Sequence, residues 1–379
     1  MWIFPEKSGQ RECTDVRKGC VTMLRIGMLT SGGDCQGLNA AMRGVAKALY
    51  EAFDEVEIIG ILDGYRGLIQ NRTRLMKPED FSGILTLGGT MLGTSRTPFK
   101  MMRVIEEDGV DKVASMIDTV KKLRLDCLVI LGGNGTHKTA NLLRTEGIHV
   151  ITLPKTIDND LWGTDMTFGF QSAVDIAANV IDCIHTTATS HGRVFIVEVM
   201  GHKVGWLTLH AGVAAGADII LLPEIPYDIE KVGRAIERRR KLGKPFSILA
   251  VAEGALSKSE AKLSKKALAA AREKEGYPSI AYRLVKELEP YVGGESRVCV
   301  PGHFQRGGAP CAYDRMLATM LGAAATRLIR EEKYGYMCGI VNNEIVPVPL
   351  EEVAGKLKKV PVDCPSIQMA REIGVSFGD

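Results

Sequence analysis

The sequence predicts an α/β protein that contains doubly wound, mainly parallel sheets. Short segments that are apolar at nearly every position recur along the chain, and most of them are separated by a segment of helical length. Strands of this kind are buried on both faces, which requires helices on both sides of the sheet. With 379 residues, the chain is long enough for two such bodies.

The first predicted strand, LRIGMLT at 24–30, leads into a predicted helix at 38–53 and a second strand at 56–62. The remaining predicted strands lie at 127–133, 150–154, 193–201, 218–224 and 246–254.

Two further segments are predicted from composition. The charged, alanine-rich segment 258–276 predicts a solvated helix. The tail beyond Ile345 predicts a surface helix and its flanks.

Composition excludes several classes of protein. The 48 basic and 45 acidic residues give a net charge of +3, which is too balanced for a protein that mainly binds nucleic acid or an anionic membrane. No apolar run reaches the roughly 18 residues that a membrane span needs. The nine cysteines form no C-x-x-C pair, which indicates a reducing compartment and predicts a cytoplasmic protein. Residues 1–22 are polar and aperiodic, so a disordered extension or an upstream start is expected there.

Unusual polar and glycine-rich segments follow five of the predicted strands: TSGGDCQGLN, GGNGTHKT, PKTIDND, EVMGHKVG and AEGA. Parallel sheets bind ligands beyond the carboxyl ends of their strands, where loops lead into the next helix. The sequence therefore predicts a functional site at these strand ends.

The segment LPKTIDND places Thr156, Asp158 and Asp160 at alternate positions, so an extended backbone would project all three side chains from one side. Pro154 and Asn159 disfavour a helix and predict a loop. A solvated turn stabilised by its own aspartates is the alternative interpretation.

Three loops are suited to anions. In SGGDCQG, Gly33 lies between a strand and a helix, and in GGNGT, Gly133 and Gly135 precede a helix that Thr136 is expected to cap. The segment LGGTMLGTSRTPF contributes Arg96. Three such loops suggest a polyphosphate, and the neighbouring aspartates suit Mg²⁺ and a base for a hydroxyl acceptor.

The later segment RVCVPGHFQRGG brings Arg297, His303 and Arg306 together, which fits a second, monoester phosphate. A basic surface loop is the alternative. For His191 and Arg193 in SHGRVF, the pattern does not decide between a turn with a surface arginine and a site.

Taken together and in this order, GGD-x-x-GLNA, GTSR, GG-x-G(S/T), TIDND, EVMG and GH-x-QRGG resemble the motifs of the 6-phosphofructokinase family over residues 24–339. The resemblance implies two doubly wound domains with the active site in the cleft between them. Residues 23–169 with 305–355 would form the domain for the phosphoryl donor, and residues 170–304 with 356–379 the sugar-phosphate domain.

The resemblance also implies an activity, namely transfer of the γ-phosphoryl group of ATP to the 1-hydroxyl of fructose 6-phosphate in glycolysis, with Mg²⁺ as cofactor. Asp158 would be the general base, and Asp160 and Asn134 would hold the metal. The phosphoryl donor would contact Gly33, Arg96, Gly133, Asn134, Gly135 and Thr136.

The sugar phosphate would contact Thr156, Asp158, Asp160, Met200, Gly201, His202, Glu253, His303 and Arg306. Arg193 and Arg297 resemble arginines that reach in from an adjacent subunit, which implies a homo-oligomer, a dimer or tetramer. Lys155 is grouped with the catalytic residues Asp158, Arg96 and Thr156, although the sequence gives it no explicit role.

Two residues favour different phosphoryl donors. Gly135 leaves space for the α-phosphate of ATP, whereas Lys155 is common in relatives that use pyrophosphate. The sequence favours ATP, because a carboxylate at position 135 would exclude the nucleotide while a lysine at 155 excludes nothing. Pyrophosphate remains the alternative donor.

Two departures from the family pattern leave other interpretations open. Asn134 stands where the family usually has an aspartate, and His202 where many members have an arginine. A weakly active regulatory paralogue that binds sugar phosphates is therefore an alternative. A lipid or NAD kinase shares the GG-x-G turn but lacks the TIDND and GH-x-QRGG pair.

Overall fold

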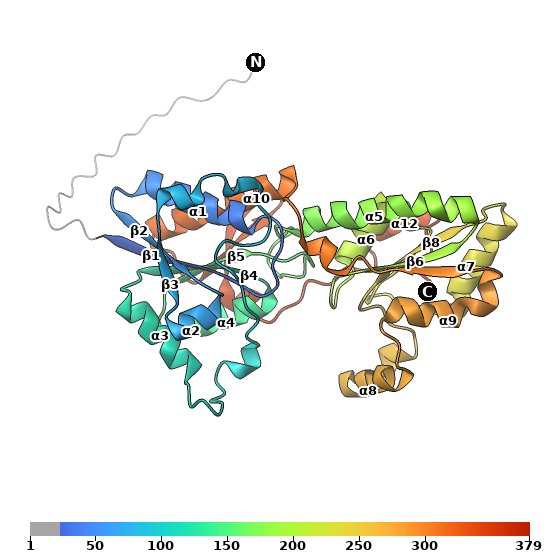
Figure 1. The fold of residues 1–379 in the computed structure, drawn as a ribbon, viewed down its shortest axis with the longest axis horizontal. Helices are drawn as coiled ribbons and strands as arrows, with labels where there is room; N and C mark the ends of the chain where they lie inside the picture. The colour runs from blue at the N-terminus through green and yellow to red at the C-terminus, as the bar shows by residue number, and fades with distance from the viewer. Residues whose placement is uncertain (1–22) are drawn as a thin grey trace, which may run out of the picture.

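The computed structural model of the protein describes residues 23–379 (Figure 1). The extension expected at residues 1–22 lies outside the described residues. The described chain forms two separate β-sheets, one of seven strands and one of four.

The seven-stranded sheet has the order β11-β10-β5-β4-β1-β2-β3. Its five central strands are parallel to one another, and the edge strands β3 and β11 are antiparallel to their neighbours. The strands are β1 (Leu24–Ser31), β2 (Val56–Ile61), β3 (Thr73–Met76), β4 (Cys127–Gly132), β5 (Val150–Pro154), β10 (Tyr336–Val341) and β11 (Glu344–Pro349). All six residues of β4 and all five of β5 are buried, as the continuous apolar runs predict.

Helices cover both faces of this sheet (Figure 1). One hydrophobic cluster joins the strands to α1 and α10, and a second joins them to α2, α3, α4 and α11. These helices are α1 (Leu38–Ala52), α2 (Tyr65–Gln70), α3 (Lys112–Lys122), α4 (Asn134–Thr145), α10 (Ala312–Arg330) and α11 (Leu350–Val353). Short 3-10 helices lie at η1 (Pro78–Phe81), η2 (Ile84–Thr86) and η3 (Phe99–Met101).

The four-stranded sheet is entirely parallel, in the order β7-β8-β6-β9. Its strands are β6 (Val194–Val199), β7 (Ile219–Leu221), β8 (Ser247–Ala252) and β9 (Ser296–Cys299). The first hydrophobic cluster continues onto one face through α5, α6 and α12, and α7 and α9 pack on the other. These helices are α5 (Phe170–His191), α6 (Trp206–Ala214), α7 (Ile229–Lys241), α9 (Ile280–Val292) and α12 (Pro365–Glu372). The 3-10 helix η5 (Gly302–Arg306) follows β9.

The predicted fold class is confirmed: both sheets are mainly parallel and carry helices on both faces. The proposed domain boundaries at residues 169, 304 and 355 stay a prediction. The prediction for the tail beyond Ile345 was wrong in part, because β11 occupies Glu344–Pro349, and the short helices α11 and α12 follow it. Pro347 and Pro349 are tolerated in β11 because it is an edge strand.

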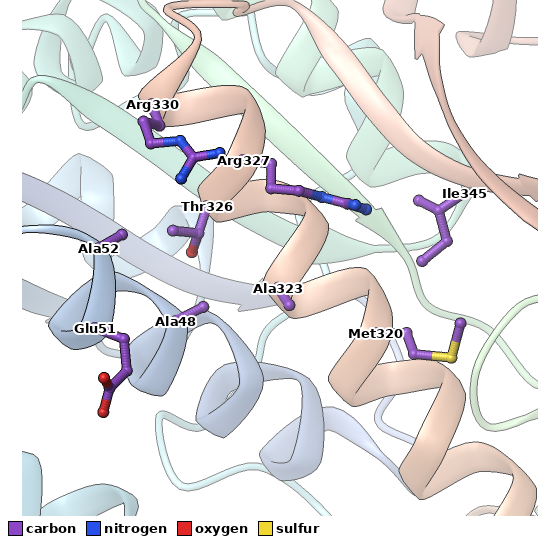
Figure 2. A pocket seen from close by; sticks show the side chains of 9 residues that line it. All are labelled: Ala48, Glu51, Ala52, Met320, Ala323, Thr326, Arg327, Arg330 and Ile345. Carbon is purple, nitrogen blue, oxygen red and sulfur yellow. The ribbon is translucent and has the colours of Figure 1, made fainter. Parts of the chain in front are cut away.

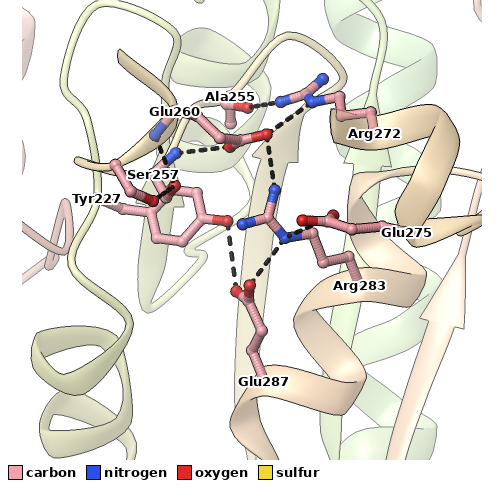
Figure 3. A network of polar contacts seen from close by, with 9 residues as sticks. Tyr227, Ala255, Ser257, Glu260, Arg272, Glu275, Arg283 and Glu287 are labelled. Atoms are coloured by element: carbon pink, nitrogen blue, oxygen red, sulfur yellow. Dashed lines mark hydrogen bonds and ion pairs between the residues drawn. The ribbon is translucent and has the colours of Figure 1, made fainter. Parts of the chain in front are cut away.

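The segment between β8 and α9 leaves the body of the protein and carries η4 (Glu260–Lys262) and α8 (Lys265–Glu275). No residue of α8 is buried, which agrees with the predicted solvated helix. Glu260 is 5% exposed and pairs with Arg272 of α8 at 2.8 Å (Figure 3). It attaches this segment to the body through Arg283 of α9 at 2.6 Å. Within residues 23–379, no helix is long and apolar enough to cross a membrane.

Candidate active site

A cavity of about 750 Å³ lies where the carboxyl ends of strands from both sheets meet. It contains most of the residues that the sequence places in the site: Gly33, Arg96, Gly133, Asn134, Gly135, Thr136, Lys155, Thr156, Asp158, Asp160, Met200, His202, Glu253, His303 and Arg306. A second cavity of about 550 Å³ lies between α1 and α10 and contains none of them (Figure 2).

The loop after β5 supplies the acidic residues of the cavity. Asn159 has a φ of 51°, in the left-handed region that asparagine tolerates, so the backbone turns instead of continuing as a strand. The Asn159 side chain is 3% exposed and holds this turn, accepting from the Thr167 N–H at 3.1 Å and donating to the Asp165 carbonyl at 3.2 Å. Thr156, Asp158 and Asp160 all line the cavity, although the segment is not a regular strand.

Both aspartates lie in a partly desolvated environment. Burial raises the pKa of Asp158, an effect opposed by the charge of Arg306. Burial, with the charge of Asp158 next, raises the pKa of Asp160 to about 6. A cation between these carboxylates would relieve both effects.

The acidic residues fit Mg²⁺, which binds through one or two carboxylates and completes its shell with water and substrate phosphates. The Asn134 side-chain nitrogen donates to the Lys356 carbonyl at 2.6 Å, so this contact leaves the amide oxygen available as a ligand. No group of three or more His, Cys, Asp or Glu side chains suited to a metal occurs among the described residues.

Two guanidinium groups converge on the glycine loop that follows β1. A Cβ atom at Gly33 would lie 2.9 Å from Arg306 Nη1 and 3.0 Å from Arg96 Nη2, so both guanidinium groups approach the backbone of this loop closely. Arg306 Nη1 donates to the Asp34 carbonyl at 3.0 Å, whereas its buried Nε has no partner among the described residues. Arg96 and Arg306 both line the cavity, and guanidinium groups suit an anionic ligand there.

The N-terminus of α4 also opens into the cavity. The helix begins at Asn134 after Gly133, so the prediction that Thr136 caps it was wrong. Thr136 lies inside the first turn, and its hydroxyl donates to the Ser31 carbonyl at 3.3 Å. Gly135 is exposed, and a Cβ added there would meet no atom within 4 Å, so the cavity is open at this position.

Lys155, which the sequence left without a role, is 3% exposed and donates to the Gly33 carbonyl. Burial lowers the pKa of its amine. The side chain thus connects the end of β5 to the glycine loop after β1 and places a cationic group beneath that loop.

Glu253 organises the opposite wall of the cavity. Its Oε1 accepts from the N–H groups of Gly201 at 3.2 Å and His202 at 2.7 Å. Gly201 itself does not line the cavity, and it acts on the wall through this contact. His202 has a φ of 53°, which turns the chain after β6 toward the cavity.

Besides Gly201, two predicted site residues lie outside the cavity, namely Arg193 and Arg297. Both guanidinium groups contact Glu295, at 2.8 Å and 2.6 Å. In one chain they therefore form a separate charged cluster at the start of β6 and β9.

Sequence reasoning missed several residues of the cavity wall, among them Tyr65, Phe99, Lys138, Lys203, Gly355 and Leu357. Lys138 follows Asn134 by four residues on α4, a helical spacing that could have identified it. Gly355 and Leu357 belong to no recognisable motif.

Comparison with known proteins identifies the family of this chain. Residues 25–329 match the family model described as phosphofructokinase. The chain is 55% identical over 357 residues to an ATP-dependent 6-phosphofructokinase of Spirochaeta thermophila, covering 93% of this chain and 97% of that protein. It is 48% identical over 377 residues to an ATP-dependent 6-phosphofructokinase of Propionibacterium freudenreichii, covering 94% and 100%.

A solved structure of Pichia pastoris phosphofructokinase in the T-state is 31% identical, with a TM-score of 0.74, and it aligns with 89% of this chain and 36% of that chain. A pyrophosphate-dependent phosphofructokinase of Nitrosospira multiformis has a TM-score of 0.77 at 20% identity, covering 94% and 92%, and supports the fold alone. The fold and the site define a phosphotransferase that acts on an alcohol group. The chain belongs to the phosphofructokinase family, so the predicted family and class of reaction are confirmed.

Proposed function

We propose that the protein transfers the γ-phosphoryl group of ATP to the 1-hydroxyl of fructose 6-phosphate, giving fructose 1,6-bisphosphate. The observation that carries the proposal is the cavity itself, which Asp158 lines together with Gly33 and the two guanidinium groups, Arg96 and Arg306, that approach this glycine. The names of the relatives support ATP as the donor.

In this reaction Asp158 accepts the proton of the 1-hydroxyl while the oxygen attacks the γ-phosphorus. The bond from this phosphorus to the bridging oxygen of the β-phosphate breaks, and ADP leaves. A carboxylate whose pKa is raised by burial is a better base than a solvated one, which suits this role. Arg96 stabilises the charge on the transferred group, and Thr156 orients the acceptor. Asp160 and Asn134 would hold Mg²⁺, which would supply positive charge to offset that of the donor phosphates.

The donor phosphates lie along Gly33, Gly133, Gly135 and Thr136, where backbone N–H groups at the start of α4 favour an anion. The sugar lies against Met200, His202 and Glu253, with Gly201 holding Glu253 in place. His303 and Arg306 bind the 6-phosphate.

Arg193 and Arg297 complete the cavity of a neighbouring copy, so the working enzyme is a homo-oligomer, a dimer or tetramer. Their position outside the lining of the cavity of their own chain, where both contact Glu295, supports this assignment. The protein acts in the cytoplasm, and the seven cysteines within residues 23–379, all of which are free, agree with a reducing compartment.

Pyrophosphate is the second candidate donor, favoured by one observation. Lys155 places a buried amine beside the Gly33 loop, where it could offset the charge of a donor that lacks a nucleotide.

The test is to measure initial rates with fructose 6-phosphate and Mg²⁺, comparing ATP with pyrophosphate across donor concentrations. Turnover with ATP alone supports the proposal, and turnover with pyrophosphate alone replaces it with the second candidate. The absence of turnover with either donor would favour a regulatory paralogue.

A further inference from the structure

The segment 355–360, called the strap here, follows α11 and passes from the large sheet to the small one. At its start, the Lys356 carbonyl accepts from Asn134 of α4 at 2.6 Å. At its end, the Val360 N–H donates to Glu224 Oε1, beyond β7, at 3.0 Å. The strap is therefore hydrogen-bonded on both sides of the cavity.

The middle of the strap runs along the acidic loop. Leu357 forms an isolated antiparallel bridge with Leu161 and lines the cavity. The Lys358 N–H donates to the Asp160 carbonyl at 2.9 Å, and the Lys358 carbonyl accepts from the Trp206 indole at 3.0 Å. The backbone of Asp160 is thus connected to α6 through one residue of the strap.

The side chain of Lys358 adds a second set of contacts to the same loop. Its Nζ donates to Asn159 Oδ1 at 3.0 Å, to the Thr164 carbonyl at 2.8 Å and to the Asp165 carbonyl at 2.8 Å. An ammonium group has three protons and no acceptor, so these contacts use its full capacity. The group also lies 5.6 Å from the ring centroid of Trp206.

The acceptors of Lys358 all belong to the turn that positions the two aspartates of the cavity. Asn159 lies between Asp158 and Asp160 and carries the left-handed backbone conformation on which the turn depends. Asn159 and Thr164 are each 3% exposed, whereas Asp165 is exposed. Removing the amine would take a donor from two buried acceptors, which favours rearrangement of the turn.

We propose that Lys358 is a positioning residue for phosphoryl transfer, which holds the Asn159 turn and thereby sets the places of Asp158 and Asp160 in the cavity. The inference rests on the proposed function. Lys358 itself does not line the cavity, so it acts through the two aspartates and not on the substrates.

Lys358→Met tests this inference because it keeps an unbranched side chain and removes all three donors. Lys359→Met is the matched control, since Lys359 is the exposed neighbour on the same strap. The measurements are kcat, the KM for fructose 6-phosphate, the Mg²⁺ concentration for half-maximal rate, and Tm, with rates taken well below the Tm of each variant.

We expect Lys358→Met to lower kcat by on the order of tenfold to a hundredfold and to raise the Mg²⁺ requirement, because small displacements of catalytic groups carry losses of this size. The KM for the sugar stays within about twofold, since the wall formed by Glu253 is untouched. Lys359→Met behaves as the wild type. Lys358→Arg keeps the charge but cannot direct three protons from one nitrogen, so its kcat falls between those of Lys358→Met and the wild type.

A folded Lys358→Met protein with kcat within about twofold of the wild type overturns the inference. The inference is also overturned if the variant regains the wild-type kcat at a lower temperature, where its lost stability no longer matters. If Lys358→Met does not fold, the same limits apply to Lys358→Arg. An inactive wild type contradicts the proposed function instead, so the two failures are distinguishable.

Discussion

Gly135 is the residue at which the structure bears most directly on donor choice. Its position at the start of α4 is open, so aspartate fits there without disturbing the protein. We expect Gly135→Asp to lower kcat/KM for ATP by on the order of a hundredfold, because juxtaposed like charges cost several kcal/mol. Activity with pyrophosphate should change much less.

The control for Gly135→Asp is Gly135→Asn, which has the same shape without the charge. Steady-state rates with both donors decide the question. Equal losses with ATP and pyrophosphate, or equal effects of aspartate and asparagine, would remove electrostatic exclusion of the nucleotide as the reason for a glycine here.

Asp158 carries the clearest catalytic prediction. Replacement by serine should lower kcat by about 10²- to 10⁴-fold, the range that general bases contribute, with a modest change in KM. Steady-state kinetics in both reaction directions provide the measurement. A nearly normal kcat would assign the base role to another group in the cavity.

At the scale of helices and strands, the segment that carries α8 depends on one buried carboxylate. Burial alone would raise the pKa of Glu260, but hydrogen bonds from Arg272 and Ser257 and the charges of Arg272 and Arg283 lower it below its usual 4.5 (Figure 3). The stabilisation from ionised Glu260 is therefore fully present above about pH 4.5, and it is lost as the pH falls through the lowered value.

We therefore expect Glu260→Gln to lower the free energy of unfolding by about 2 kcal/mol at pH 7. The deficit should be constant from pH 5 to 8 and shrink toward pH 3, where the wild-type carboxyl also becomes neutral. Thermal unfolding across this range provides the measurement. Glu289→Gln serves as control, because the Glu289–Lys286 pair is exposed and should contribute little. A deficit that persists undiminished at pH 3 would attribute the effect to packing.

The burial of each strand and its position in the sheet determined whether the strand could be predicted from the sequence. Strands such as β4 and β5 are apolar throughout because both of their faces are buried, so their residues alone identify them. Strand β11 was missed because its alternating prolines are tolerated only in an edge strand. Whether a strand lies at an edge depends on the whole sheet and cannot be read from the segment itself. The turn of Asn342 and Asn343, with φ values of 52° and 65°, was the local signal for the β10–β11 hairpin.

For the whole molecule, the cavity was predictable because its motifs follow strand ends, and parallel strands bring those ends together. The strap was not predictable, since Lys358 acts through backbone carbonyls about 200 positions earlier in the chain. Carbonyl acceptors leave no trace in the side-chain pattern, so only the fold reveals them.

The sharing of active sites between subunits can be tested with mixed oligomers. If Arg297 of one subunit completes the cavity of another, each active site takes its Asp158 from one chain and its Arg297 from the neighbouring chain. A mixed oligomer then contains sites with both residues intact, formed from the Asp158 of one chain and the Arg297 of the other. We expect each variant to be nearly inactive alone and co-expressed chains with different tags, purified through both tags, to regain a substantial fraction of wild-type activity. A mixture of Asp158→Ser with Arg96→Ala should regain none, because both residues line the cavity of the same chain. Mixed oligomers of the first kind that stay inactive would place Arg297 outside the site and leave each cavity to a single chain.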